Sequence, residues 1–123
     1  MIDGGCFCGE VRYRIEDGDY PAAHCHCTMC RRTSGAPFVT WLVVPKEKFA
    51  FTAGMPKALQ SSDRGRRFFC PSCGTPMTCI VDDHPDNVDV TIGSLDDPER
   101  FVPRFEIHTD TRLSWVQTDL KRD

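Results

Sequence analysis

The sequence has no apolar run that approaches the roughly 20 residues needed to cross a bilayer, which argues against a membrane protein. It also lacks an excess of positive charge, because 15 Lys and Arg residues stand against 18 Asp and Glu residues and give a net charge of -3. This balance argues against a nucleic-acid partner. The chain has no internal repeat, low-complexity tract or linker. We therefore expect residues 1–123 to form a single domain that binds neither membranes nor nucleic acid.

A secretory signal peptide is not evident at the start of the sequence. The segment Met1-Ile2-Asp3-Gly4-Gly5 has no basic run, and no apolar stretch follows it. We therefore expect a cytoplasmic protein, in which thiols stay reduced. In that compartment, clustered cysteines are typical of metal sites or redox centres.

Seven of the eight cysteines fall into three tight clusters, which are Cys6-x-Cys8, Cys25-x-Cys27-x-x-Cys30 and Cys70-x-x-Cys73. The first and third clusters together supply four thiolates, and the middle cluster supplies three. Zinc takes four protein ligands in structural sites, and three ligands plus an open position in catalytic sites. The count therefore predicts two zinc ions per chain, with an iron–sulfur cluster and disulfides as the less favoured alternatives.

Local geometry supports this grouping. A two-residue period would place the sulfurs of Cys6 and Cys8 on one face of a strand. Pro71 and Gly74 favour a tight turn around Cys70 and Cys73, and such a turn is usually one half of a tetrahedral zinc site. The first cluster is its natural other half. The middle cluster combines strand spacing with turn spacing, so that its three sulfurs can converge on one metal.

The remaining pattern predicts an all-β fold of short strands joined by turns, because nine prolines and nine glycines punctuate the chain. Alternating or β-rich runs predict strands at residues 11–15, 38–44, 49–52, 67–69, 88–92, 105–107 and 113–116. One short helix is expected at residues 28–33, ended by Ser34-Gly35, and a second turn is expected at 97–101, where Pro98 could start it.

Four segments resemble the signatures of the glutathione-dependent formaldehyde-activating enzymes, a family also called the centromere protein V domain. They are residues 5–13, 25–38, 69–76 and 93–98, accompanied by His108 and Trp115. The resemblance spans about residues 4–115. It implies a single-domain, zinc-binding β-tent built from short antiparallel strands, and a carbon–sulfur lyase that breaks S-hydroxymethylglutathione into glutathione and formaldehyde. It further implies a structural zinc at Cys6, Cys8, Cys70 and Cys73, and a catalytic zinc at Cys25, Cys27 and Cys30.

The residues of the middle cluster fit such chemistry. Zinc with three thiolates carries a formal negative charge and is a weak Lewis acid, so its open position suits a soft substrate thiol bound as thiolate. Arg31 and Arg32 directly follow Cys30 and could offset this charge or bind a substrate carboxylate. The alternative for this pair is a solvated surface position. The alternative function is a zinc-stabilised binding module without catalysis.

Three further residues could take part in the site. His26 lies between two of the cysteines, and strand parity favours a packing or supporting role over metal ligation. His108 is expected to be structural, with lining of the pocket as the alternative. Cys79 is expected to be a buried core thiol, with a fourth ligand to the second zinc as the alternative. Trp41 and Trp115 are expected in the core or the pocket wall.

Overall fold

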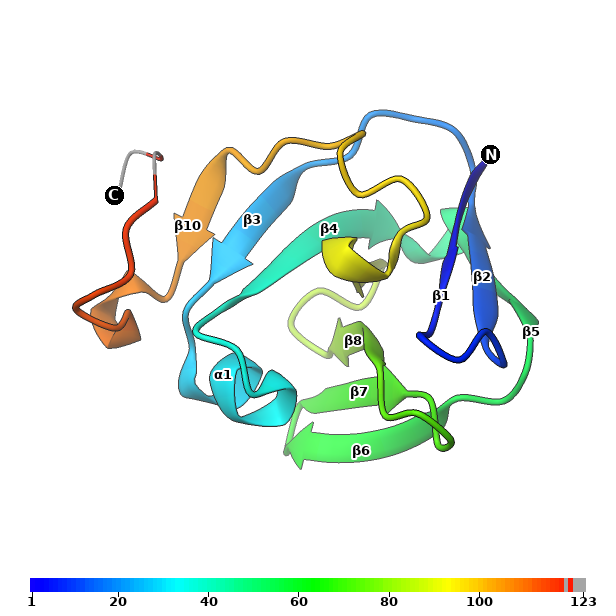
Figure 1. Ribbon diagram of the computed structural model, residues 1–123, viewed down its shortest axis with the longest axis horizontal. Helices are drawn as coiled ribbons and strands as arrows, with labels where there is room; N and C mark the ends of the chain where they lie inside the picture. The colour runs from blue at the N-terminus through cyan, green and yellow to red at the C-terminus, as the bar shows by residue number, and fades with distance from the viewer. Residues whose placement is uncertain (119, 121–123) are drawn as a thin grey trace.

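The structure, a computed structural model that describes residues 1–118 and 120, consists of two β-sheets and one short α-helix (Figure 1). The smaller sheet has the order β1-β2-β5, formed by β1 (Ile2–Gly5), β2 (Arg12–Ile15) and β5 (Phe49–Ala53). The larger sheet has the order β10-β3-β4-β9-β8-β7-β6. Its strands are β3 (Ala22–Cys25), β4 (Val39–Pro45), β6 (Lys57–Ser62), β7 (Gly65–Phe69), β8 (Pro76–Val81), β9 (Asn87–Thr91) and β10 (Phe105–Ile107).

Short helical segments complete the fold. The α-helix is α1 (Thr28–Ser34), and single 3-10 turns occur at Lys46–Lys48, Ile92–Ser94 and Thr109–Thr111. The Cys27 side chain accepts a hydrogen bond from the Cys30 N–H and so caps the start of α1. Gly35 ends the helix in the left-handed conformation, with φ 74°, as the sequence predicts. Within the described part of the chain, no helix is long and apolar enough to span a membrane.

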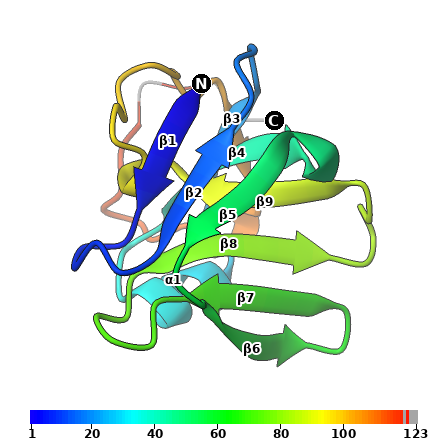
Figure 2. The same cartoon turned by 90° about the vertical axis from the view of Figure 1, so that its right-hand side faces the viewer.

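The main hydrophobic core lies where the small sheet packs across the large one (Figure 2). Tyr13 on β2 is buried, and its ring contacts the rings of Phe49 and Phe51 on β5. The large sheet contributes fully or nearly fully buried side chains from one of its faces, namely Leu42, Val44, Val88 and Val90. The expected alternation of apolar residues on β2 and β9 is therefore confirmed.

The opposite face of the large sheet carries polar and sulfur-bearing residues. Arg67 on β7 pairs with Cys79 on β8, and Cys79 pairs in turn with Asp89 on β9. Residues directly opposite each other on antiparallel strands point to the same face, so these three side chains form a row across the sheet. Helix α1 and Trp41 lie beside this row, which makes this face the setting of the candidate site.

The C-terminal segment differs from the sequence prediction in two ways. Strand β10 forms as expected but pairs with β3 in parallel, and the other strand pairs are antiparallel. Its parity is also the reverse of the apolar pattern, because Glu106 is 7% exposed whereas Phe105 is 54% exposed. The Glu106 carboxylate is buried because it pairs with His26 Nε2 at 2.9 Å and accepts a hydrogen bond from Thr118 Oγ1.

Other predictions of local structure are wrong. Residues 113–116 form a turn instead of a strand, and Trp115 is exposed instead of lying in the core or the wall of the cavity at the three-cysteine cluster. By contrast, the turn expected within residues 97–101 is present, with the Arg100 N–H donating to the Asp97 carbonyl oxygen at 3.4 Å. Cys6 and Cys8 lie in the loop after β1, not on a strand. Strands β1, β3, β6 and β8 were not predicted. Glycine, proline or polar residues interrupt the apolar alternation by which the other strands were found.

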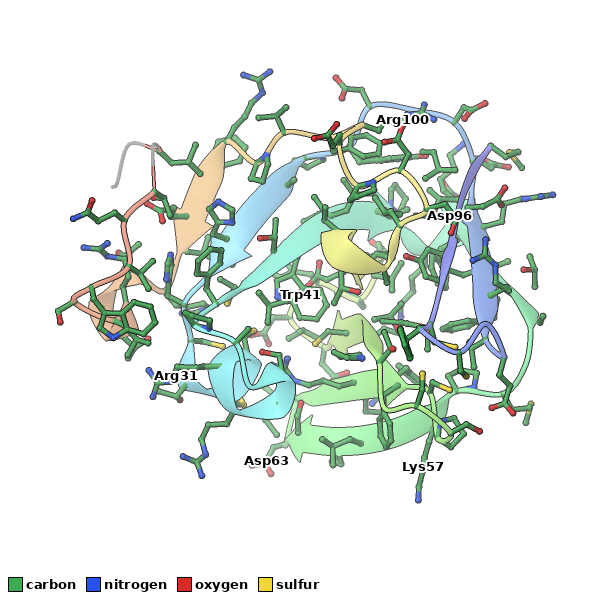
Figure 3. All side chains as sticks on the ribbon, viewed as in Figure 1. Arg31, Trp41, Lys57, Asp63, Asp96 and Arg100 are labelled. Atoms are coloured by element: carbon green, nitrogen blue, oxygen red, sulfur yellow. The ribbon has the colours of Figure 1, made fainter. Side chains whose placement is uncertain are left out.

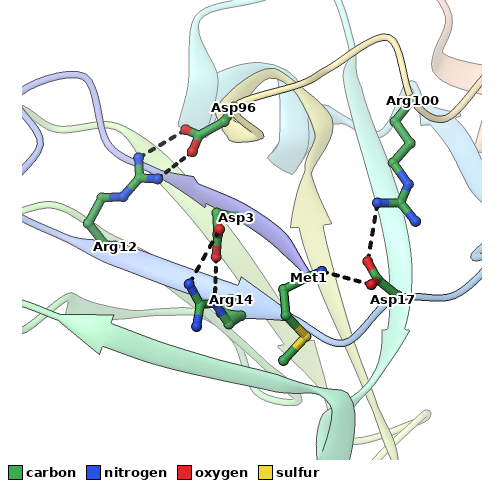
Figure 4. Close-up of polar contacts among 7 residues, drawn as sticks. All are labelled: Met1, Asp3, Arg12, Arg14, Asp17, Asp96 and Arg100. Carbon is green, nitrogen blue, oxygen red and sulfur yellow. Dashed lines mark hydrogen bonds and ion pairs between the residues drawn. The ribbon is translucent and has the colours of Figure 1, made fainter.

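Surface ion pairs connect strands within the small sheet and connect this sheet to the segment after β9 (Figure 4). Arg14 on β2 contacts Asp3 on β1 at 2.7 Å, and Arg12 pairs with Asp96 in the segment that follows β9. These side chains are partly exposed, so each pair contributes little free energy of folding. The buried contact between Tyr13 Oη and Ser94 Oγ, at 2.6 Å, connects the same two segments inside the protein.

We predict that Gly4→Ala destabilises the fold, because a Cβ at residue 4 would lie 2.7 Å from the Ser94 carbonyl oxygen and 2.5 Å from Tyr13 Cζ. Such overpacking typically costs about 1–3 kcal/mol, measurable by urea denaturation. Gly93→Ala is the matched control, since nothing lies within 4 Å of the added Cβ. Equal stability of the two variants would contradict this account of the packing around β1.

Candidate metal centres

Four cysteines from two distant loops meet at one point in the structure. The loop after β1 supplies Cys6 and Cys8, and the loop between β7 and β8 supplies Cys70 and Cys73. The Cys6 and Cys8 sulfurs are 3.6 Å apart, and the Cys8 and Cys70 sulfurs are 3.8 Å apart. All four sulfurs lie within 4.8 Å of one another. The fold thus brings together the four residues that the sequence grouped across more than half of the chain.

The two loops have matching backbone geometry. Gly9 donates to the Cys6 carbonyl with φ 82°, and Gly74 donates to the Cys70 carbonyl with φ 84°. Backbone N–H groups point at the sulfurs, with Val11 N 3.2 Å from Cys6 Sγ. Each loop is therefore a tight turn that presents its sulfurs inward, and a hydrogen bond with Thr75 lowers the pKa of Cys73 to about 5.

The other three clustered cysteines converge at the start of α1. Cys25 ends β3, Cys27 caps the helix, and Cys30 lies in its first turn. The Cys25 and Cys30 sulfurs are 3.4 Å apart, and all three sulfurs lie within 4.8 Å of one another. No other His, Cys, Asp or Glu of residues 1–118 and 120 joins this group.

The sulfur spacings fit a metal ion better than disulfides. All eight cysteines are free, and a disulfide would place two sulfurs only about 2.0 Å apart. A tetrahedral zinc with bonds of about 2.3 Å to sulfur places its ligands about 3.8 Å from each other. The distances of 3.4–3.8 Å in both clusters are close to this value. Each cluster could therefore hold a metal ion.

Cys30 has the most polarised sulfur of the three-cysteine cluster. Trp41 Nε1 donates to it at 3.4 Å, and both terminal nitrogens of Arg67 lie 3.6 Å from it. The hydrogen bond with Cys25 is the largest cause that lowers the pKa of Cys30 to about 5, and Trp41 and the charge of Arg67 act in the same direction. The site thus stabilises negative charge on sulfur even before a metal is considered.

The buried arginine of this site is Arg67, which the sequence analysis did not select. Arg67 is only 9% exposed and lies over the Trp41 ring at 5.9 Å. Arg31 and Arg32, which were selected, do not line the cavity next to the cluster. Figure 3 shows Arg31 on the outer side of α1, away from Trp41. The available signal was an arginine inside the β-rich run 67–69, just before the Cys70 turn.

A cavity of about 640 Å³ opens onto the three-cysteine cluster. Its buried wall includes Cys25, Cys30, Trp41, Arg67 and Cys79. Its exposed mouth is formed by the β6–β7 and β8–β9 turns, through Ser62, Asp63, Arg64, Asp83 and His84. The four-cysteine cluster does not line this cavity. The four-cysteine cluster therefore lies between its two loops away from the cavity, with Cys8 exposed, whereas the three-cysteine cluster faces space for a small molecule.

The structure also places the three residues whose roles the sequence left open. His26 is fully buried, paired with Glu106, and outside the metal-ligand group, as expected. Cys79 is buried as expected and lines the cavity, but its sulfur does not join the three clustered ones. His108 is exposed, has φ 55°, and lines the cavity, which fits the alternative of a pocket-lining histidine.

Comparison with known proteins agrees with this arrangement. The family model described as "Glutathione-dependent formaldehyde-activating enzyme" matches residues 1–111. The chain belongs to this family. The match includes both cysteine clusters and most of the cavity wall, and it confirms the resemblance noted in the sequence.

Two relatives and one solved structure extend the comparison. A Halomonas elongata protein named "Putative glutathione-dependent formaldehyde-activating enzyme" is 25% identical over 97% of this chain and 82% of its own length. A Schizosaccharomyces pombe protein named as an uncharacterized lyase is 27% identical over 61% of this chain and 54% of its own. A Rhodobacter sphaeroides crystal structure, 24% identical, covers 82% of this chain and 91% of that one with a TM-score of 0.66. This last similarity supports the fold.

We predict that metal analysis of the purified protein finds two bound ions per chain. Cys27→Ser should remove one ion and keep the fold, because its cluster joins residues only a few positions apart. Cys70→Ser should remove the other and strongly destabilise the protein, since a structural zinc can contribute on the order of 10 kcal/mol to folding. Cys79→Ala is the control and should retain both ions. Loss of an ion in that variant would show that Cys79 is a ligand.

Proposed function

We propose that this protein is a zinc-dependent lyase that cleaves the carbon–sulfur bond of a thiol–formaldehyde adduct such as S-hydroxymethylglutathione. One observation carries this proposal: a cluster of three thiols, without a fourth protein ligand in the described residues, faces a cavity large enough for a small thiol. The family description and the lyase name of one relative support the same reaction class. Cytoplasm, where glutathione keeps thiols reduced, is the proposed compartment.

We assign one zinc to Cys6, Cys8, Cys70 and Cys73 as a structural ion, and one to Cys25, Cys27 and Cys30 as the catalytic ion. The all-thiolate donor sets favour a soft metal, and the sulfur spacings match tetrahedral zinc. When bound at the three-cysteine site, zinc would supply an acceptor for the substrate sulfur and keep that sulfur deprotonated.

Arg67 would balance the charge that builds up in the cavity. Three cysteine thiolates and a substrate thiolate carry more negative charge than one divalent ion neutralises. Burying this remaining negative charge would cost much free energy. The Arg67 guanidinium already contacts Cys30 Sγ, and Thr33 Oγ1 lies 3.3 Å from its Nη1 and helps to fix it. Departure of a thiolate from the adduct carbon would therefore occur beside a preorganised positive charge.

The cavity mouth would contact the remainder of the thiol. Arg64 and the nearby Ser62 and His84 offer hydrogen-bond partners for the amide and carboxylate groups of a glutathione-like molecule. Arg31 and Arg32 stay a prediction as carboxylate contacts outside the cavity. In this proposal the residues of the inner wall act in the reaction, and the residues of the turns at the mouth determine which thiol binds.

The proposal predicts that the protein accelerates exchange of formaldehyde with glutathione. Carbon-13-labelled formaldehyde passes between its hydrate and S-hydroxymethylglutathione, and exchange NMR measures the rate with and without protein. Cys27→Ser, which retains the structural site, should return the rate to the uncatalysed value. A fourth protein ligand seen by zinc-edge spectroscopy, together with no effect on exchange, would instead identify a zinc-stabilised binding module.

We predict that Arg67→Ala lowers kcat/KM by on the order of 100-fold, as expected when a preorganised charge next to the reacting centre is removed. Arg66→Ala is the matched control, because Arg66 is the neighbouring residue on β7 and points to the other face, toward Asp82. Zinc content and melting temperature, measured on both variants, separate the catalytic effect from unfolding. Equal rates in the two variants would remove Arg67 from the mechanism.

A further inference from the structure

Asp89 has a carboxyl group that lines the cavity and takes no part in the proposed metal binding. Its neighbours on β9, Val88 and Val90, point into the main core, so the Asp89 side chain points to the opposite face and lines the cavity. It is half-buried, and it forms no hydrogen bond or ion pair within residues 1–118 and 120. The Asp89 carboxyl group therefore lies between two core valines in sequence but faces the cavity without an ion-pair partner among the described residues.

The position of Asp89 relative to the charged wall is fixed by strand register. Arg67, Cys79 and Asp89 occupy successive strands of one cross-strand row. Because neighbouring strands lie about 4.8 Å apart, the backbones of Arg67 and Asp89 are about 10 Å apart. A small adduct between them would have its sulfur near Arg67 and Cys30, and its carbon and hydroxyl group toward Asp89.

The surroundings of Asp89 suit proton transfer near neutral pH. Burial is the main cause that raises its pKa to about 6, the Cys30 charge acts in the same direction, and His84 and Arg67 oppose it. The other groups facing it are the Cys79 thiol on β8 and Val43 on β4. Burial raises the pKa of Cys79 to about 11, so that thiol stays protonated. A base works best when its pKa lies near the working pH.

We propose that Asp89 is the general base that removes the hydroxyl proton of the thiol–formaldehyde adduct. This role rests on the proposed function. In the step, the O–H proton moves to the Asp89 carboxylate, the O–H electron pair forms the second C–O bond, and the C–S bond breaks. The C–S electron pair leaves with sulfur as a thiolate beside Arg67, and formaldehyde is released. In the reverse direction the Asp89 carboxylic acid returns the proton, so no further reactant is needed.

Other acids and bases at the cavity are less suited to this step. Asp83 is exposed at the mouth and already pairs with Arg64. Asp63, His84 and His108 are also exposed. Asp89 is the half-buried carboxyl group of this wall, which places it where water is restricted and a proton can pass directly to the substrate.

The test compares Asp89→Asn with Asp82→Asn in the zinc-loaded protein, using the formaldehyde exchange measurement. Asp82 is an exposed acid outside the cavity, so its variant makes the same charge change without touching the wall. We expect Asp89→Asn to lower kcat/KM by about 100-fold, the usual contribution of a general base, and Asp82→Asn to match the wild type. Asp89→Glu should restore part of the rate because it keeps a carboxylate.

Two further readouts separate this role from a structural one. The wild-type rate should rise with pH through the Asp89 pKa of about 6 and then level off, because the base must be ionised, and Asp89→Asn should lose this rise. In substrate-free protein, carbon-13 NMR of the aspartate carboxyl groups should find one that titrates near this pKa in the wild type and is missing in Asp89→Asn. This readout does not depend on activity. Metal content and melting temperature report on folding, and Asp89→Ser replaces Asp89→Asn if the latter does not fold.

The possible results have distinct meanings. A folded, zinc-loaded Asp89→Asn protein with the wild-type rate would overturn the role of Asp89 and leave the proposed function intact. A titrating carboxyl group that persists in Asp89→Asn would assign the base to another residue. A wild-type protein that does not accelerate exchange would overturn the proposed function and this role with it.

Discussion

The strict alternation of side chains on the large sheet is the constraint on which the rest of the structure depends. Val88, Val90 and Leu42 fill the core against the small sheet, while Arg67, Cys79 and Asp89 face the cavity from the opposite face of the same sheet. A shift of register by one residue would exchange the two sets and place charged groups in the core. The packing of the core thus fixes which groups reach the site.

The charged and polar groups around Cys30 bear on which ligands the cavity would bind. Cys30 combines the influence of two neighbouring thiols, an indole N–H and a guanidinium group on a single sulfur. With the proposed zinc bound, such a site would favour a ligand that arrives as a thiol and stays as a thiolate over hard oxygen anions, which would add charge without a soft bond. The four-cysteine cluster does not line this cavity, which fits the structural role proposed for it.

Local signals in the sequence were enough to find both cysteine clusters, the helix that starts at Thr28 and the alternating strands. Gly74 lies within the Cys70 turn, and the residues that cap α1, Cys27 and Gly35, lie directly before and after the helix in the sequence. The sequence missed Arg67 because its contact with Cys30 joins residues 37 positions apart. It also missed the inverted burial of β10, since Glu106 is buried only through His26, 80 residues away. Contacts of this length depend on the assembled sheet and leave no local pattern.

The contacts of His26 have a consequence for the order in which the protein assembles. His26 lies between two cysteines of the cavity cluster, and residues 106–111 hold it through the Glu106 carboxylate, the Ile107 carbonyl oxygen and the Thr111 hydroxyl. The sulfurs of the four-cysteine cluster come from residues up to Cys73, and hydrogen bonds of Gly74 and Thr75 complete its second turn. During synthesis from the N-terminus, the residues that form this cluster are therefore all present while the cavity cluster still lacks the contacts around His26. The cavity cluster gains this support only when residues 106–111 have been added to the chain.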